Sequence, residues 1–263
     1  MICTVALFAI LVADAATPPQ EKWGPAQGGV RTRLSANDSE FSLGKPMLFR
    51  LEVENIGDRI VQFDAGQVHV NASMSVEGSD GVAAPYVAGM AQTGGGPHPL
   101  RPGERRILFD ALDIEKQYLL TSAGTYTVRF RGQDEGFGDT AIPASNPITI
   151  RVADGAVRPS RSIGRMFVDA SQSSGWRVEY VRDVDAGTAL ALSRGKRAKL
   201  GTPWVRVWVV SPSETPSPDA EEAPQPLGHS AWGEVYWSLR NATADEESAA
   251  RKLVVTTLGI EER

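Results

Sequence analysis

The feature that most constrains this fold is an alternation of apolar and polar residues between clusters of turn-forming residues, from Gly28 to Val152. Successive side chains of a β-strand point to opposite faces, so a period of two predicts strands with one buried and one solvated face. Short strands separated by turns at this spacing are typical of an antiparallel sandwich. The clearest strand is 46–54, whose apolar face consists of Met47, Phe49, Leu51 and Val53.

Two later segments, 124–130 and 146–152, are also predicted to be strands. In the first of them, Tyr126, Val128 and Phe130 share one face, so the Tyr126 hydroxyl needs a buried hydrogen-bond partner. A tyrosine that enters a late strand just after a glycine turn resembles the tyrosine corner of immunoglobulin-like sandwiches. There the hydroxyl bonds to the backbone a few residues upstream.

Turn motifs extend this resemblance. Val-x-Asn-x-Gly, at 53–57, is expected to close a hairpin, and Pro102-Gly103 is expected to reset the chain before a strand. The chain resembles bacterial immunoglobulin-like modules, of the adhesion-related and intracellular-proteinase-inhibitor type, over residues 28–152. The segments that carry the resemblance are Leu43–Pro46, Leu48–Asp58, Leu100–Glu104 and Gly124–Val128. It implies an N-terminal immunoglobulin-like β-sandwich. The chain departs from a compact module at 82–99, a long Gly-rich excursion that is either a binding loop or a disordered insertion, and its composition favours mobility.

A second domain is predicted after a polar linker at 153–162, which Gly155 and Pro159 punctuate. We expect a small α+β domain over 163–263, with an antiparallel sheet and a C-terminal helix across one face. Nothing in this domain resembles a family that we recognise. Its predicted strands are 166–170, 176–182, 188–193, 204–210 and 233–240.

The C-terminal helix has the most specific signal in the chain. Thr243 and Glu246 form the pattern of a capping box, and Gly259 is placed to end the helix in the left-handed conformation. Between the last two predicted strands, residues 211–231 are rich in proline and acidic side chains at their start. We expect this loop to be disordered, because it cannot contribute to a core.

The N-terminus has the pattern of a secretory leader. An uncharged, mostly apolar run, 2–13, is followed by Ala13-Asp14-Ala15, so we predict a signal peptide at residues 1–15. The run is too short to cross a bilayer, although no basic residue precedes it; a buried first strand is the alternative. The only cysteine, Cys3, lies within the leader, so the exported chain has neither a disulfide nor a thiol nucleophile.

No motif predicts a catalytic residue, a metal site or a cofactor. The three histidines, His69, His98 and His229, lack the spacing of metal ligands. The acidic segment 134–139 could hold calcium through oxygen ligands, but solvated carboxylates are far more common in loops. The formal net charge of −5 disfavours nucleic acid and anionic lipid as partners.

One constellation of aromatic residues is unusual, and we predict it to bind a partner. In the strands 204–210 and 233–240, valines alternate with large aromatic and charged side chains. If the valines lie under the helix, the opposite face presents planar rings and hydrogen-bonding groups, which suit a sugar, a peptide or a partner protein. The alternative is that this face packs on the sandwich or under the 211–231 loop. The predicted partner-binding residues are Trp204, Arg206, Trp208, Trp232, Glu234 and Tyr236.

These features lead to a functional hypothesis. We expect a non-catalytic binding or scaffold protein of the bacterial cell envelope, exported to the periplasm or beyond, that recognises a protein or a glycan. We expect no nucleic-acid partner and no stable membrane insertion. One alternative is an enzyme, or an enzyme subunit, with a site between the domains, for example near Asp183 or Asp185. A protease inhibitor is a further alternative that rests on the fold resemblance alone.

Overall fold

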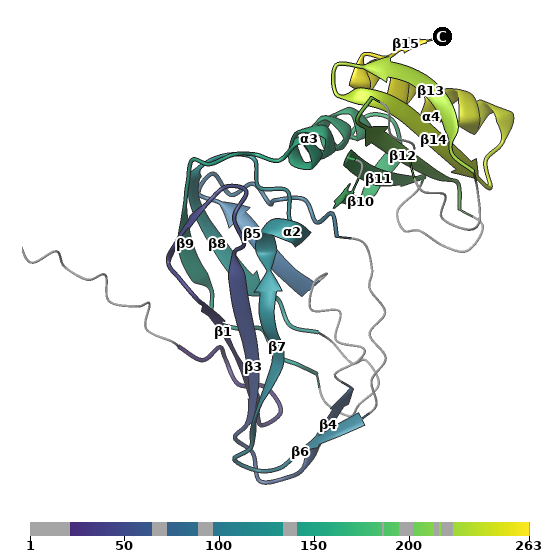
Figure 1. The fold of residues 1–263 in the computed structure, drawn as a ribbon. Coiled ribbons are helices and arrows are strands. Elements are labelled where there is room, and N and C mark those ends of the chain that lie inside the picture. Colours follow the sequence, from purple (N-terminus) through teal and green to yellow (C-terminus); the bar gives the residue numbers. More distant parts are fainter. Residues whose placement is uncertain are drawn as a thin grey trace, which may run out of the picture.

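The computed structural model describes residues 22–64, 73–88, 97–133, 141–185, 187–194, 202–212, 216 and 223–262. The fold is mainly β, with several antiparallel sheets and a C-terminal helix, as the sequence predicts (Figure 1). Two large hydrophobic cores define an N-terminal unit, 22–153, and a C-terminal unit, 159–262. Within the described ranges, no helix combines the length and the apolar character that a membrane span requires. The predicted leader, 1–15, lies outside these ranges.

The N-terminal unit consists of two main sheets. The first contains, in order, β1 (Val30–Ala36), β3 (Leu48–Asn55) and β7 (Arg105–Asp113). The second contains, in order, β2 (Glu40–Ser42), β9 (Ile148–Ala153), β8 (Gly124–Phe130) and β5 (Met74–Gly78). Neighbours are antiparallel except β2, which runs parallel to β9. The remaining elements are β4 (Val61–Asp64), its partner β6 (Pro97–Leu100) and the one-turn helix α2 (Ile114–Gln117).

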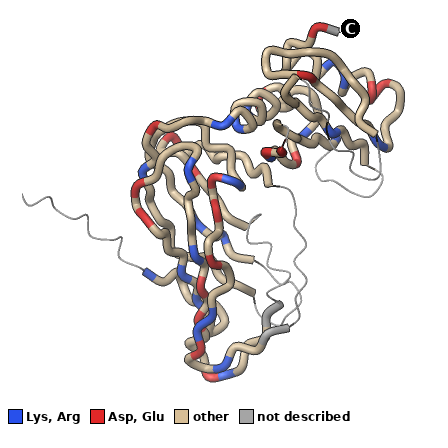
Figure 2. The backbone as a smooth tube through the Cα atoms, viewed as in Figure 1, with Lys and Arg blue, Asp and Glu red and all other residues tan. Residues whose placement is uncertain are grey.

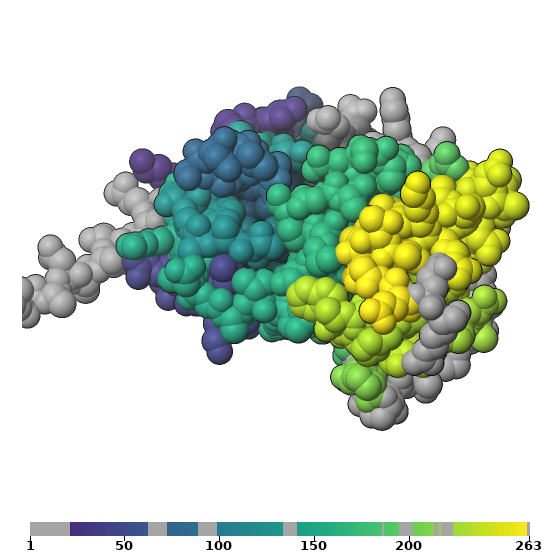
Figure 3. All heavy atoms as spheres, turned by 90° about the horizontal axis from the view of Figure 1, so that it is seen from above, coloured from purple at the N-terminus to yellow at the C-terminus, as the bar shows by residue number. Residues whose placement is uncertain are grey.

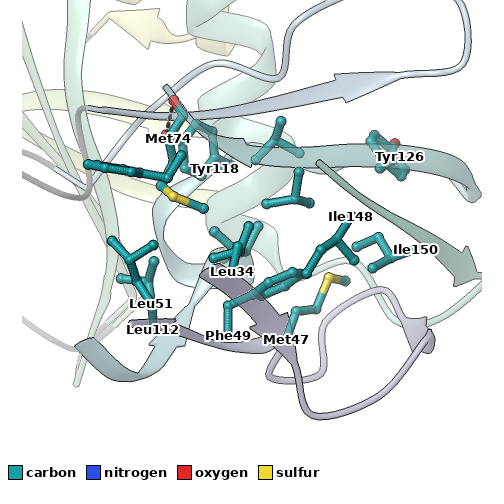
Figure 4. Packing of buried hydrophobic residues seen from close by; sticks show 14 of the residues in the cluster. Leu34, Met47, Phe49, Leu51, Met74, Leu112, Tyr118, Tyr126, Ile148 and Ile150 are labelled. Carbon is teal, nitrogen blue, oxygen red and sulfur yellow. Dashed lines mark hydrogen bonds between the residues drawn. The ribbon is translucent and has the colours of Figure 1, made fainter. Parts of the chain in front are cut away.

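A single core fills the space between these two sheets, and Figure 4 shows its packing. The predicted apolar face of 46–54 is correct, because its four side chains are at most 1% exposed. The Tyr126 hydroxyl donates to the Ser122 carbonyl at 2.8 Å, which is the upstream backbone bond predicted for it. A second buried tyrosine, Tyr118, donates to the Met74 carbonyl at 2.9 Å (Figure 4). Both phenols therefore enter the core without leaving an unsatisfied hydroxyl.

Asn55 links two of the turn motifs, although it does not close the predicted hairpin. Its fully buried amide donates to the carbonyls of Arg59 and Leu100, at 2.7 and 2.9 Å. Its backbone bonds to both Gly103 and Glu104. The strand that follows, β4, pairs with β6 instead of returning along β3. The hairpin prediction is wrong because the asparagine joins sequentially distant turns.

Basic and acidic residues are interspersed along the strands of the β1–β3–β7 sheet (Figure 2). Glu54, which is almost buried, accepts from Arg31 at 2.6 Å and from Arg105 at 2.7 Å. Burial acts to raise the pKa of Glu54, but the hydrogen bonds from the two arginines outweigh it and lower that pKa. The Trp23 ring lies beside three guanidinium groups, with centroid distances of 4.7 to 5.5 Å, from Arg31, Arg33 and Arg105. This contact ties the start of the described chain to the sheet.

The C-terminal unit is a six-stranded antiparallel sheet with two helices on one face. The helices are α3 (Pro159–Ser171) and α4 (Ala244–Leu258). Both contribute to the core with the sheet. The strands are, in spatial order, β10 (Trp176–Val184), β11 (Gly187–Arg194), β12 (Trp204–Val210), β14 (Gly233–Arg240), β13 (Gln225–Ser230) and β15 (Glu261–Glu262).

The start of this unit differs from the prediction. The expected strand at 166–170 is part of α3, and the expected linker, 153–162, ends where Pro159 begins that helix. Proline is favourable at this position, because the first helical N–H has no intrahelical partner. The buried side of α3 includes serine, arginine and glycine, so hydrophobicity alone does not reveal its helical period. Its buried residues are Ser160, Arg161, Ile163, Gly164 and Phe167.

The predicted loop at 211–231 also contains a strand, because residues 225–230 form β13. Pro226 and Gly228 argue against a strand in the sequence. The register of β13 against β14 shifts between these two residues, and β15 pairs only with Gly228 and His229. Pro226 therefore lies at a bulge and outside the stretch that β15 covers, which are positions where proline is tolerated.

The C-terminal helix agrees with its prediction. Thr243 accepts from the Glu246 amide while the Glu246 side chain accepts from the Thr243 amide, which completes the capping box. Gly259 adopts φ 60° and ψ 47° at the other end. Since α4 is specified at both termini, its apolar side is held at a fixed place under the sheet.

The two units are joined by a backbone hydrogen bond, and two residues of the N-terminal unit pack in the core of the C-terminal unit. Figure 3 shows them in contact. Val87, from the first part of the predicted Gly-rich excursion, accepts from the Val181 amide at 2.8 Å, and Ala88 forms a bridge with Tyr180. Val87 and Leu119 both lie in the core of the C-terminal unit. The described residues 82–88 of the excursion thus extend to the edge of β10, and 97–99 belong to β6, while 89–96 lie outside the described residues.

An ion pair is buried at the same joint. Arg161 of α3 lies 3.4 Å from Glu115 of α2, and their side chains are only 5% and 4% exposed. A second pair, Arg158 with Asp183 at 2.9 Å, is far more exposed. The buried pair costs desolvation, so removing one partner leaves an uncompensated charge.

We predict that Glu115→Gln lowers the free energy of unfolding by about 3–5 kcal/mol, because it strands the Arg161 charge in the joint. The double change Glu115→Leu with Arg161→Met is expected to recover most of this loss. Asp183→Asn, in the exposed pair, is the matched control and is expected to cost less than about 1 kcal/mol. Urea denaturation measures all three, and equal losses for Glu115→Gln and Asp183→Asn would contradict the argument.

We also predict an acid-dependent contribution from Glu54. Because the pKa of Glu54 is lowered in the fold, its stabilisation is complete above the unfolded carboxyl value, about 4.3, and is lost as pH falls through the folded value. Glu54→Gln should therefore reduce stability at pH 7 and flatten the pH dependence below that unfolded value. Denaturation midpoints at several acidic pH values test this. Glu77→Gln, at an exposed position of β5, should keep the parent profile.

Candidate functional site

Of the predicted aromatic residues, Trp204, Trp208 and Tyr236 lie on the face of the six-stranded sheet that carries no helix, and Trp232 lies in the turn between β13 and β14. The alternating valines, Val205, Val207, Val209 and Val235, lie in the core with α3 and α4, whereas Val210 lies on the other face. Opposite them, Trp208 pairs in register with Tyr236, and Trp204 pairs with Arg240. We call the side chains of Tyr180, Trp204, Trp208, Trp232 and Tyr236 the aromatic face.

The members of the aromatic face differ in exposure. Trp208 is 6% exposed and packs in a small cluster that also contains Ala189 and Val210. Trp204 and Tyr236 are half-buried, whereas Trp232, in the turn between β13 and β14, is 41% exposed. Trp208 therefore serves the fold, and the ring surface open to a ligand belongs to the other residues.

Tyr180 belongs to this face, although a simple alternation of period two would place it on the opposite one. In the sequence, Trp176, Val178 and Tyr180 share one face of a strand. The structure has an irregularity between Val178 and Tyr180, where Glu179 is the additional residue against β11. Val178 therefore faces the helices, while Tyr180 faces away from them, with its ring 6.5 Å from that of Trp204. A bulge reverses the alternation in this way, and no residue in the segment marks it.

Charged side chains accompany the rings. Arg182 is exposed, and its guanidinium carbon lies 5.1 Å from the centroid of the Tyr180 ring. Arg206 and Glu234 are half-buried and have contacts within the protein. Nδ1 of His229 lies 3.6 Å from a Glu234 carboxylate oxygen. The face thus combines flat apolar rings with groups that form directional hydrogen bonds.

In the part of the chain that the structure describes, the joint between the units runs along one edge of this face. It uses the edge of β10, and the small cluster around Trp208 contains only residues of the C-terminal unit. Burial of these aromatics by the sandwich is therefore not what the described residues show. Pro216 is buried, but positions 213–215 and 217–222 of the 211–231 loop lie outside the described residues. Burial of the face under that loop stays a prediction.

Asp183, an acidic residue that the sequence suggested for an alternative site, is an ion-pair partner of Arg158. Partial burial acts to raise the pKa of Asp183, but its bonds, including that from Arg158, outweigh this effect and lower the pKa. A carboxyl with a lowered pKa is a poor proton donor at neutral pH. In the described ranges, no three His, Cys, Asp or Glu side chains gather as a metal site. The acidic segment 134–139 lies outside those ranges.

Two open cavities lie where the units meet. One, of about 480 Å³, is lined by the turn 78–85, by 119–126 and by Arg165. The other, of about 600 Å³, lies between Pro85–Tyr86, the end of α3 and the start of β10. The Arg165 side chain is paired with Asp169 at 3.0 Å. Neither cavity is lined by a residue of the predicted aromatic site.

Comparisons with known proteins do not identify a family. No family model matches the sequence, and no curated protein matches it significantly. A β-glucosidase from Listeria innocua is weakly similar in structure, with a TM-score of 0.24 and 14% identity over 49% of this chain and 16% of that one. Its complex with isofagomine gives a TM-score of 0.25 and 13% identity over 57% and 20%. The chain spans a fifth or less of that enzyme, and a similarity this weak indicates neither fold nor activity.

We predict that Trp208 and Trp232 respond differently to truncation. Trp208→Ala should lower the free energy of unfolding by about 3–5 kcal/mol, because it leaves a cavity beside Ala189 and Val210. Trp232→Ala should change it by roughly 0.5 kcal/mol, as expected at an exposed position. Urea denaturation of both variants measures the difference, and similar losses would contradict the assignment of Trp208 to the fold.

Proposed function

We propose that this chain is an exported, non-catalytic binding protein of the bacterial cell envelope, which contacts a protein or a glycan through the aromatic face. The observation that carries the proposal is the uneven burial of that face. Tyr180, Trp204 and Tyr236 keep part of their ring surface open on a sheet face without helices, and Trp232 is exposed in the turn between β13 and β14. Clustered aromatic side chains with polar neighbours are characteristic of binding surfaces.

The N-terminal unit is proposed to be an immunoglobulin-like sandwich that acts as a scaffold. Its strand order supports this, since β1, β3 and β7 take the places of strands A, B and E, and β5, β8 and β9 those of C, F and G. The Tyr126 bond to Ser122 supports it further, because it has the geometry of a tyrosine corner. Such a scaffold would hold the C-terminal unit away from the start of the mature chain.

Two further arguments support the proposal. The leader pattern at 1–15 favours export, and the periplasm or the extracellular space is the proposed location. The shifted carboxyl pKa values, those of Glu54, Glu104, Asp183 and Glu246, are all lowered. A carboxyl general acid typically needs a raised pKa, so none of these four groups is a candidate for that role.

The proposal predicts that Trp232→Ala combined with Tyr236→Ala reduces capture of envelope components at least about tenfold, since exposed aromatic anchors carry much of the affinity of such surfaces. The chain without residues 1–15 is immobilised and exposed separately to purified cell-wall glycans and to envelope proteins. Bound material is quantified. Circular dichroism establishes that each variant is folded.

The matched control is Trp23→Ala, which removes another half-buried tryptophan, on the outer face of the sandwich. It should leave capture unchanged. If the folded double variant binds as well as the parent, or if Trp23→Ala causes the same loss, the aromatic face is not the binding surface. Turnover of a glycan by the parent protein would replace the binding proposal with an enzyme.

A further inference from the structure

We propose that the ligand of the aromatic face is an acidic glycan, whose sugar rings stack on the Tyr180–Trp204 pair while Arg182 and its neighbours bind the carboxylates. This inference rests on the proposed function, because it names the ligand class of the same face. It is argued from the charge, the ring geometry and the small exposed apolar area of the C-terminal unit.

The charge of this face differs from that of the chain. The sequence is acidic, with a formal net charge of −5. On the side of the sheet without helices, however, Arg182, Arg206 and Arg240 accompany Glu234 around the rings. Glu261 also lies on this side, because it pairs in register with His229, which contacts Glu234. The Arg177–Glu179 pair there is neutral, so the three arginines outnumber the two glutamates, Glu234 and Glu261, by one. The described part of the face therefore carries an excess of positive charge, which complements an anion.

The arrangement of the rings suits a sugar. Tyr180 and Trp204 come from β10 and β12, and the strand between them presents only Ala189, Ala191 and Ser193 on this face. The two rings lean over these small residues, at an interplanar angle of 50°. The C–H face of a pyranose is apolar and flat, so it stacks on such rings while its substituents reach polar side chains at the rim.

Arg182 is placed to recognise a carboxylate beside the stacked sugar. Its guanidinium group lies over the Tyr180 ring and is exposed at the edge of the face. A guanidinium group presents a planar fork that bonds both oxygens of one carboxylate, and stacking on an aromatic ring orients that fork. A ligand that alternates sugar rings with carboxylates therefore fits this side of the face.

A protein partner fits less well. Specific protein interfaces bury about 800 Å² on each partner and contain an apolar centre. Among the described residues of the C-terminal unit, Trp232 is the only exposed large hydrophobic residue, and even it is only 41% exposed. The half-buried rings supply the remaining apolar area in small pieces, which suits a ligand one sugar wide.

The experiment measures binding of short oligogalacturonates by isothermal titration calorimetry at physiological ionic strength, again without residues 1–15. The fully methyl-esterified oligomer has the same rings but no charge, and hexaglutamate has the charge but no sugar. We expect measurable binding of the acidic oligomer, and at least about tenfold weaker binding of both comparison ligands, since each lacks one of the two contacts.

Arg182→Gln should weaken binding of the acidic oligomer about tenfold, through loss of a charge-assisted hydrogen bond. Arg182→Lys should recover only part of it. Arg165→Gln, at an exposed arginine of α3 paired with Asp169, is the matched control and should bind like the parent. Four acidic residues of the chain lie between positions 213 and 222, so a variant with these neutralised tests whether they compete for the face.

The outcomes separate this inference from the proposed function. Equal binding of hexaglutamate would make an acidic peptide the partner and would overturn the glycan. Equal binding of the methyl ester, or no effect of Arg182→Gln, would overturn the role of charge while leaving the aromatic face in place. If no oligosaccharide binds, but capture of envelope proteins still depends on Trp232 and Tyr236, the glycan inference fails and the proposed function stands. If no binding depends on those two aromatic residues, both the glycan inference and the proposed function are wrong.

Discussion

The structure depends on one short stretch of β10, where a bulge and a pairing with the other unit coincide. The irregularity between Val178 and Tyr180 reverses the alternation of side chains. At the same place, Val87 and Ala88 of the N-terminal unit pair with Val181 and Tyr180. An exposed edge strand is a liability for aggregation, and bulges and covering segments both protect it. Here the protection also connects the units and places Tyr180 on the aromatic face.

The two units are held together by packed side chains as well as by the chain that connects them. Val87 and Leu119 fill part of the second core, and a Cβ added at Gly164 of α3 would lie only 3.0 and 3.1 Å from side-chain atoms of Val181 and Leu119, so these would have to shift. The buried ion pair of Arg161 and Glu115 adds a polar interaction to this otherwise apolar packing between the units. Replacement of such a pair by apolar residues is often neutral or stabilising, so its energy does not explain its presence. We infer instead that the pair helps to fix the position of α3 against α2, because separating the two groups would leave each charge buried without its partner.

Several elements could be predicted from the sequence because their signals are local. The strand 46–54 alternates without interruption, and both ends of α4 have caps that depend on single residues, Thr243 and Gly259. Other elements depend on distant contacts. The buried side of α3 contains Arg161, which only its partner on α2 makes tolerable there. Likewise β13 contains Pro226, which only the bulge and the short reach of β15 permit.

The candidate site likewise has some features that could be predicted from the sequence and others that could not. The pairing of β12 with β14, and the choice of face for the valines, follow from alternation and are correct. Alternation does not reveal how deeply a face is buried, and it places Trp208 and Trp204 together although only Trp204 is partly open. Tyr180 could not be assigned, because the bulge that turns it has no signal in the residues themselves.

A sheet face without helices must still exclude water from its backbone, and this requirement explains why the same rings serve the fold and a ligand. On β11 the side chains of this face are as small as Ala189 and Ala191, yet both alanines are buried. The larger side chains of β10 and β12 cover them. The aromatic residues therefore stabilise the sheet first, and a ligand uses only the surface that this packing leaves open. Binding on such a face is expected to be selective for thin, flat ligands, since a larger partner would have to displace the rings that shield the strand below.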